Sequence, residues 1–128
     1  MSLTGSVRMI ISGIGNTIDA NIAIAGTGAI VIDESIADLV TDGLIDCSFV
    51  LARLTAFYMC ADQALEIATN SAGAPQETIT LAANKPFVYV PGSGLPSPFA
   101  GNVTGLYVTN ASGAAASLQI RALLDVTV

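Results

Sequence analysis

The fold is decided by residues 116–126, which carry the sequence ASLQIRALLDV. Apolar side chains occupy every second position from Leu118 to Leu124, and the polar Gln119 and Arg121 lie between them. Because successive side chains of a β-strand point to opposite faces, this alternation predicts a strand with one buried face.

The same alternation recurs earlier in short runs separated by Gly, Asn, Pro and Ser. We expect further strands at residues 5–12, 20–25, 29–32, 64–69, 77–82, 87–90 and 105–110. Turns that recur about every 8–12 residues are typical of a sandwich, jelly roll or barrel. The sequence predicts a single all-β domain over residues 1–128, an antiparallel β-sandwich and, more finely, a jelly roll. Its expected core residues are Leu65, Ile67, Ile79, Leu81, Leu106, Val108, Leu118 and Ile120.

Two segments carry more specific predictions. Residues 47–61 are largely apolar on both alternating faces, which favours a central strand that is covered on both sides. Arg53 is the exception in this run, and it either crosses an edge or pairs with a carboxylate. The sequence Gly26-Thr27-Gly28 predicts a tight turn that folds 20–25 back on 29–32 as a hairpin.

Residues 33–43 break the alternation, and helical spacing relates the apolar side chains there, Ile32, Ile36, Leu39 and Val40. Ser35 and Asp38 resemble a capping box, and Gly43 is a residue type at which helices commonly end. We expect one short helix over residues 35–42, with a buried strand as the alternative.

The composition favours assembly. The apolar content is 52%, and the charged content is 11%, against about 25% in typical soluble domains. Small residues must therefore cover most of the surface, which leaves it poorly defended against association. Burial in an assembly is one solution, and a small-residue surface that tolerates water is the other.

The charge excludes two kinds of partner. With four basic and ten acidic residues the net charge is −6, and the basic residues are scattered. Nucleic-acid binding needs clustered Lys and Arg, and a polybasic membrane patch needs the same. No signal peptide or membrane span is expected at residues 1–14, so we expect synthesis in the cytosol.

The chain contains no His, so triads built on imidazole cannot form. We expect no enzymatic activity, no catalytic residue, no cofactor and no metal ligand. The acidic residues between 33 and 46 are either a solvated face or a site for a divalent cation or a basic partner. Cys47 and Cys60 are expected to be reduced, with a disulfide as the alternative. The three tyrosines are expected to pack in the core or an interface rather than to bind sugar.

The expected interface consists of Leu95, Phe99, Ala114 and Ala115. Leu95 and Phe99 lie in a proline-rich loop, where apolar side chains need a partner outside the strands. Ala114 and Ala115 belong to an alanine-rich turn that offers a smooth patch for close packing. Phe99 is expected to lie outside the core, so that Phe99→Asp would leave the fold intact.

Four stretches also carry a resemblance to known proteins: residues 54–62 (LTAFYMCAD), 64–70 (ALEIATN), Pro75 with 77–81 (ETITL), and 105–116 (GLYVTNASGAAA). In these stretches the chain resembles small β-rich structural proteins of tailed bacteriophages, of the capsid decoration or cement type. The resemblance implies a virion protein, made in the bacterial cytoplasm, that forms homo-oligomers and binds a major capsid or other virion protein. A carbohydrate- or ligand-binding β-sandwich is the alternative.

Overall fold

The computed structural model describes residues 3–11, 13, 15, 18–94 and 96–125. Ten strands are assigned in these residues: β1 (Leu3–Ile11), β2 (Ile18–Gly26), β3 (Gly28–Ile36), β4 (Gly43–Ile45), β5 (Leu54–Ala61), β6 (Leu65–Thr69), β7 (Thr78–Leu81), β8 (Phe87–Tyr89), β9 (Leu106–Thr109) and β10 (Ala116–Leu124). A 3-10 turn, η1 (Leu51–Arg53), precedes β5. No helical segment of this part of the chain has the length and apolarity needed to cross a membrane.

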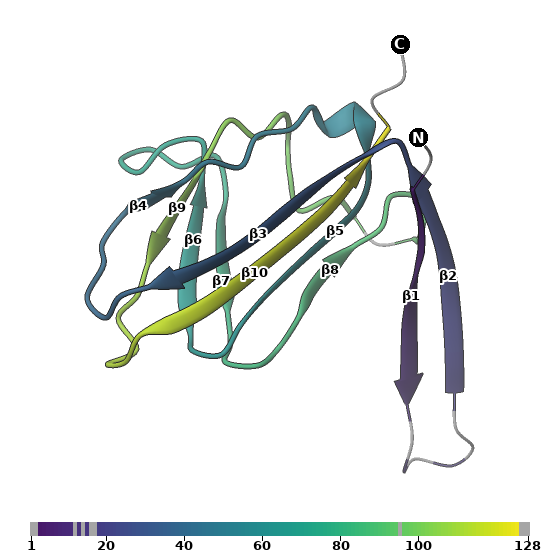
Figure 1. Cartoon of the computed structure of the whole chain (residues 1–128), viewed down its shortest axis with the longest axis horizontal. Coiled ribbons are helices and arrows are strands. Elements are labelled where there is room, and N and C mark those ends of the chain that lie inside the picture. Colours follow the sequence, from purple (N-terminus) through teal and green to yellow (C-terminus); the bar gives the residue numbers. More distant parts are fainter. Residues whose placement is uncertain (1–2, 12, 14, 16–17, 95, 126–128) are drawn as a thin grey trace.

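The strands form a sandwich of two four-stranded sheets, with a two-stranded arm at one side (Figure 1). One sheet has the order β3-β10-β5-β8, and the other has the order β4-β9-β6-β7. Every strand pair is antiparallel. The predicted all-β antiparallel sandwich is therefore confirmed.

The pairing is nested along the sequence. The strand β6 pairs with its neighbour β7, and successively more distant pairs, β5–β8, β4–β9 and β3–β10, surround that hairpin. The chain thus behaves as one long hairpin that is folded over to make two sheets.

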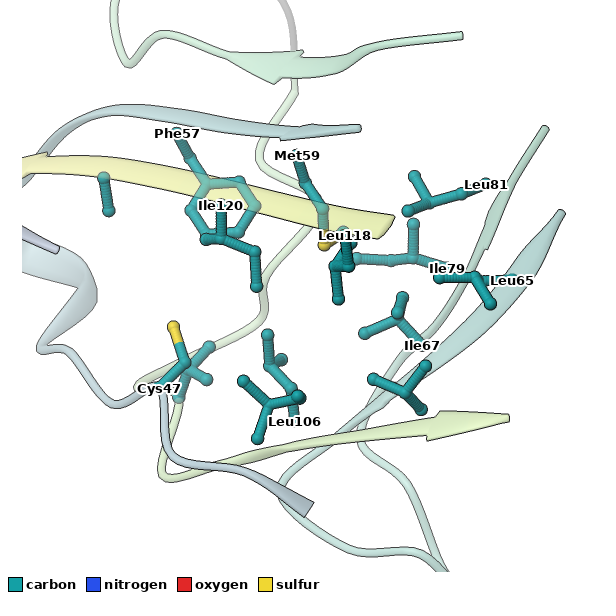
Figure 2. Packing of buried hydrophobic residues seen from close by; sticks show 14 of the residues in the cluster. Cys47, Phe57, Met59, Leu65, Ile67, Ile79, Leu81, Leu106, Leu118 and Ile120 are labelled. Atoms are coloured by element: carbon teal, nitrogen blue, oxygen red, sulfur yellow. The ribbon is translucent and has the colours of Figure 1, made fainter. Parts of the chain in front are cut away.

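The core lies between the sheets and contains all eight residues predicted for it, each at most 8% exposed. Figure 2 shows side chains of β5 and β10 pointing toward those of β6, β7 and β9. Because successive side chains of a strand point to opposite faces, each strand places every second side chain on the inner face.

Three phenylalanines close one part of the core. The ring centroids of Phe49 and Phe99 are 5.4 Å apart, and those of Phe57 and Phe99 are 5.2 Å apart, both edge to face. Phe99 is 3% exposed. The prediction that Phe99 lies outside the core is therefore wrong, because its loop folds back and inserts the ring between two core rings.

The prediction of a short helix over residues 35–42 is also wrong, because β3 continues to Ile36 and pairs there with Ala116 of β10. The following residues form turns, and Leu39 and Asp42 have positive φ angles of 67° and 52°. Leu39 is 77% exposed, so the helical spacing of apolar residues did not reflect a buried face. Pairing with a distant strand overrides the local pattern.

Residues 47–61 form a strand over part of their length. A bridge between Phe49 and Val103 and the turn η1 precede β5, which lies inside its sheet between β10 and β8. Arg53 is exposed in η1, where its guanidinium donates to the main-chain oxygen of Asp125 at 3.5 Å.

Asn110, which is 1% exposed, ties the two sheets together at one end. Its Nδ2 lies within hydrogen-bond distance of three main-chain oxygens, those of Ile36 at 3.1 Å, Ala37 at 3.2 Å and Ala114 at 2.9 Å. Its Oδ1 accepts from the main-chain nitrogen and the hydroxyl of Ser112. One buried amide thus holds the end of β3 and the turn before β10.

Candidate interaction surface

The strands β1 and β2 form a separate arm. The sequence predicted that residues 20–25 fold back on 29–32, but β2 pairs with β1 in register from Leu3 opposite Gly26 to Ile11 opposite Ile18. The strand β3 pairs with β10 instead. Gly26-Thr27-Gly28 is thus a bend between two sheets and not a hairpin turn.

The arm has two unlike faces. Residues directly opposite each other in an antiparallel pair point to the same side, so the register defines one face by Leu3, Val7, Ile22 and Ile24. These four side chains are half-buried. The other face carries exposed residues, among them Thr4, Ser6, Arg8, Asp19, Asn21 and Ala23. An apolar face on a two-stranded ribbon needs a cover, because two strands alone are marginally stable in water.

A groove of about 900 Å³ separates the arm from the outer face of the β3-β10-β5-β8 sheet. Residues 4–8 and Ile24 line its arm side. The sheet side includes a row of residues that lie opposite one another on the four strands, Val31, Arg121, Tyr58 and Val88. Val31 is 64% exposed. Polar side chains occur on both sides, but most of the surface that lines the groove is apolar.

The base of the arm is fixed to β10. A Cβ atom at Gly26 would lie 2.6 Å from the main-chain oxygen of Leu124, so glycine is required for this close approach. The Thr27 amide donates to the same oxygen at 2.8 Å. Figure 1 shows the arm leaving the sandwich from this end and pointing away from it at the other. These contacts fix the base of the arm beside the end of β10.

The charges beside the groove cancel in pairs. On the arm, Arg8 donates to both carboxylate oxygens of Asp19, at 3.0 and 2.6 Å. The ion pair raises the pKa of Arg8 and lowers the pKa of Asp19. On the sheet, Arg121 donates to both carboxylate oxygens of Asp33, at 3.0 and 3.2 Å. Both pairs are exposed, so they contribute little to stability. Their main effect is to cancel the charges beside the groove.

The predicted interface residues that the structure describes, Phe99, Ala114 and Ala115, do not line this groove. Phe99 belongs to the core, and Leu95 lies outside the described residues. Ala114 and Ala115 are exposed, in a turn that the Ser112 hydroxyl and Asn110 hold through hydrogen bonds to Ala114. A contact role for these two alanines stays a prediction.

The acidic segment does not form the helical stripe that its spacing suggested. Asp33 binds Arg121, and the Asp42 amide donates to the Thr109 hydroxyl at 3.2 Å. Across the described ranges, no three His, Cys, Asp or Glu side chains are grouped closely enough to hold a metal ion.

The two cysteines are free thiols in different settings. Cys47 is 1% exposed, and its burial, helped by the carboxylate of Asp46, raises the pKa of its thiol to about 11. Cys60 is half-buried on the outer face of β5, beside Tyr58. Burial and the neighbouring Cys60 raise the pKa of Tyr58.

We expect Cys47 to make the fold sensitive to alkali. In the unfolded chain its thiol ionises near pH 9, whereas in the folded chain it keeps its proton until about pH 11. Its contribution is therefore complete below pH 9 and is lost as the pH rises to 11, by about 2 kcal/mol of unfolding free energy. Urea unfolding at pH 8 to 11 measures this loss. Cys47→Val is the control, because it keeps the loss due to Tyr58 and should show a shallower decline. Parallel declines in the two proteins would contradict the prediction.

The sequence contained a signal for the arm that the strand assignment missed. Gly13, Gly15 and Asn16 lie between two alternating runs of equal length, and Gly13 and Gly15 have positive φ angles of 87° and 63°. These residues mark the reversal of the chain better than residues 26–28. What the sequence could not indicate is that the second run leaves the sandwich.

The arrangement offers a surface for an apolar partner, with paired charges at its border. No protein-family model, no curated protein sequence and no solved structure matches this chain.

Proposed function

We propose that the chain is a non-enzymatic structural subunit of a bacteriophage particle, of the capsid decoration or cement type. It is made in the host cytoplasm and acts in the virion through contacts with other copies of itself and with a major capsid or other virion protein. The observation that carries the proposal is the apolar groove beneath the arm.

The groove supports an assembly role because it exposes apolar surface that one chain alone does not cover. Soluble monomers seldom leave such contiguous apolar surface uncovered, and where they do it commonly marks a contact site. The low charged content, 11%, works in the same direction. A subunit present in many copies can use contacts that are individually weak, because their effects combine over a shell.

The virion setting is supported by the resemblance of residues 48–128 to small phage structural proteins. The nested strand order adds support for the finer fold prediction. Two four-stranded sheets with the nested pairs β3–β10, β4–β9, β5–β8 and β6–β7 are what a jelly roll would require, and jelly rolls are frequent in viral capsid proteins. We therefore propose that the sandwich is a jelly roll.

The test is to ask whether the chain enters particles. We expect the protein, expressed in cells that produce the phage encoding it, to sediment with density-purified particles and to appear there by mass spectrometry. Particles lacking the protein should take up the purified chain. If the chain is absent from particles and does not bind particles that lack it, the proposal fails.

The groove also supports a second candidate, a ligand-binding module. A volume of about 900 Å³ lies within the range of small-molecule sites, and Tyr58 and Arg121 would supply polar contacts there. Such a module should be monomeric, and its melting temperature should rise with a sugar or other ligand. A subunit that assembles should instead show a measured mass in solution that changes with protein concentration.

A further inference from the structure

We propose that the groove between the arm and the β3-β10-β5-β8 sheet is filled by the arm of a second copy of this chain, in a reciprocal exchange. The inference rests on the proposed function and names the partner at this surface. It follows from the base of the arm, from the charges and from the area available.

The arm cannot cover the sheet of its own chain along its whole length. At Gly26 the backbone approaches Leu124 so closely that no Cβ atom fits, and the Thr27 amide bonds to the same residue. This anchor sets the direction in which β2 leaves the sandwich. The groove between the arm and the sheet therefore has room for a segment of a second chain.

The charges favour a copy of the same chain at this surface. The net charge of −6 makes copies repel one another on average. Residues 3–26 contain one Arg and one Asp, which bind each other, and the outer face of the sheet presents the balanced pair of Arg121 and Asp33. The two surfaces that would meet are therefore locally neutral, so the repulsion is smallest there.

The area that an exchange could bury is at most near the lower limit for a specific dimer, because the apolar face of the arm is already half-buried in its own chain. Each strand of the arm has nine residues, so one face of the ribbon measures about 30 Å by 10 Å, or roughly 300 Å². A two-fold exchange covers two arm faces and two receiving surfaces, about 1,200 Å² in total, which reaches the lower end of specific interfaces. Such an exchange is closed by its symmetry and does not propagate into fibres.

The test compares charges placed on opposite faces of the arm. Ile22→Asp puts a carboxylate on the apolar face, and Ala23→Asp puts the same charge one residue away on the exposed face. On the sheet, Val31→Asp enters the groove, and Thr80→Asp lies on β7 of the other sheet. Size-exclusion chromatography with light scattering gives the mass, and circular dichroism melting checks the fold.

We expect the wild type, Ala23→Asp and Thr80→Asp to form a dimer or larger species that dissociates on dilution. Ile22→Asp and Val31→Asp should shift the measured mass to that of the 12.9 kDa monomer, because each weakens dimerisation at least about tenfold. Their melting curves should be those of a folded monomer. If Ile22→Asp fails to fold, Val31→Asp alone decides, because Val31 is exposed on the sandwich.

Two outcomes would overturn the inference and leave the proposed function standing. One is assembly that survives both Ile22→Asp and Val31→Asp, which would place the contact elsewhere. The other is a wild type that is monomeric at high concentration yet enters particles, which would make another virion protein the occupant. A wild type that is monomeric and also fails to enter particles would contradict both the arm exchange and the proposed function.

Discussion

Phe99→Asp is expected to abolish folding. Phe99 is 3% exposed and its ring lies edge to face against Phe49 and Phe57. Removing a buried Phe side chain costs about 3–5 kcal/mol through lost burial and the cavity left behind. An ionised carboxylate at the same place adds the cost of an unpaired buried charge. Because domains are stable by about 5–15 kcal/mol, the sum should leave the variant largely unfolded at neutral pH.

Circular dichroism and urea unfolding measure this effect, and Ser93→Asp is the matched control. Ser93 is exposed in the same proline-rich loop, so the same charge there should change stability by less than about 0.5 kcal/mol. Phe99→Ala should fold, with a clearly lower urea midpoint. If Phe99→Asp instead melts within a few degrees of the wild type, Phe99 is not a core residue and the earlier expectation of a loop contact returns.

Asn110→Asp is expected to have the second largest effect. The amide nitrogen of Asn110 lies near the main-chain oxygens of Ile36, Ala37 and Ala114. A carboxylate would turn this donor into an acceptor that faces three other acceptors. Each buried polar group left without a partner costs about 1–3 kcal/mol, so we expect a loss of at least about 3 kcal/mol at pH 7.

The loss should shrink in acid. The native surroundings disfavour the charged form of the new Asp, which raises its folded pKa above the unfolded value of about 3.9. The penalty is therefore small below that value and grows as the pH rises through it. Urea midpoints at pH 4 and pH 7 test this dependence. Asn84→Asp, in an exposed turn, is the control and should cost little at either pH. Equal effects at the two sites would contradict the role given to Asn110.

The parts of the fold that were predictable depend on local alternation. In β6, β7, β9 and β10 the large apolar residues of the core fall on one face, and each of those strands lies within the range expected from the sequence. Period two in a short run leaves one arrangement that buries the apolar set, so the eight core residues followed directly. The sandwich itself followed from the number and spacing of such runs.

The parts that were missed depend on contacts between distant residues. The strand β3 runs to Ile36 because β10 pairs with it there, and no pattern within residues 33–43 indicates that partner. Phe99 enters the core because its loop folds over one end of the sandwich, and a proline-rich segment has no periodicity that would predict this. The groove depends on where the arm meets the sandwich, at the close approach of Gly26 to the main chain of Leu124, and these two residues are far apart in the sequence.

The nested pairing has a consequence for the order of folding. The strand β10 lies between β3 and β5, and the ion pair of Arg121 with Asp33 joins residues 88 positions apart. Until residues 116–124 have been synthesised, β3 has no neighbour in its sheet, whereas β1 and β2 follow each other in the chain and can pair earlier. Contacts of such long range slow folding, typically to milliseconds or seconds. A nascent chain would therefore display the arm well before the sandwich closes, and neighbouring nascent chains could engage through it first.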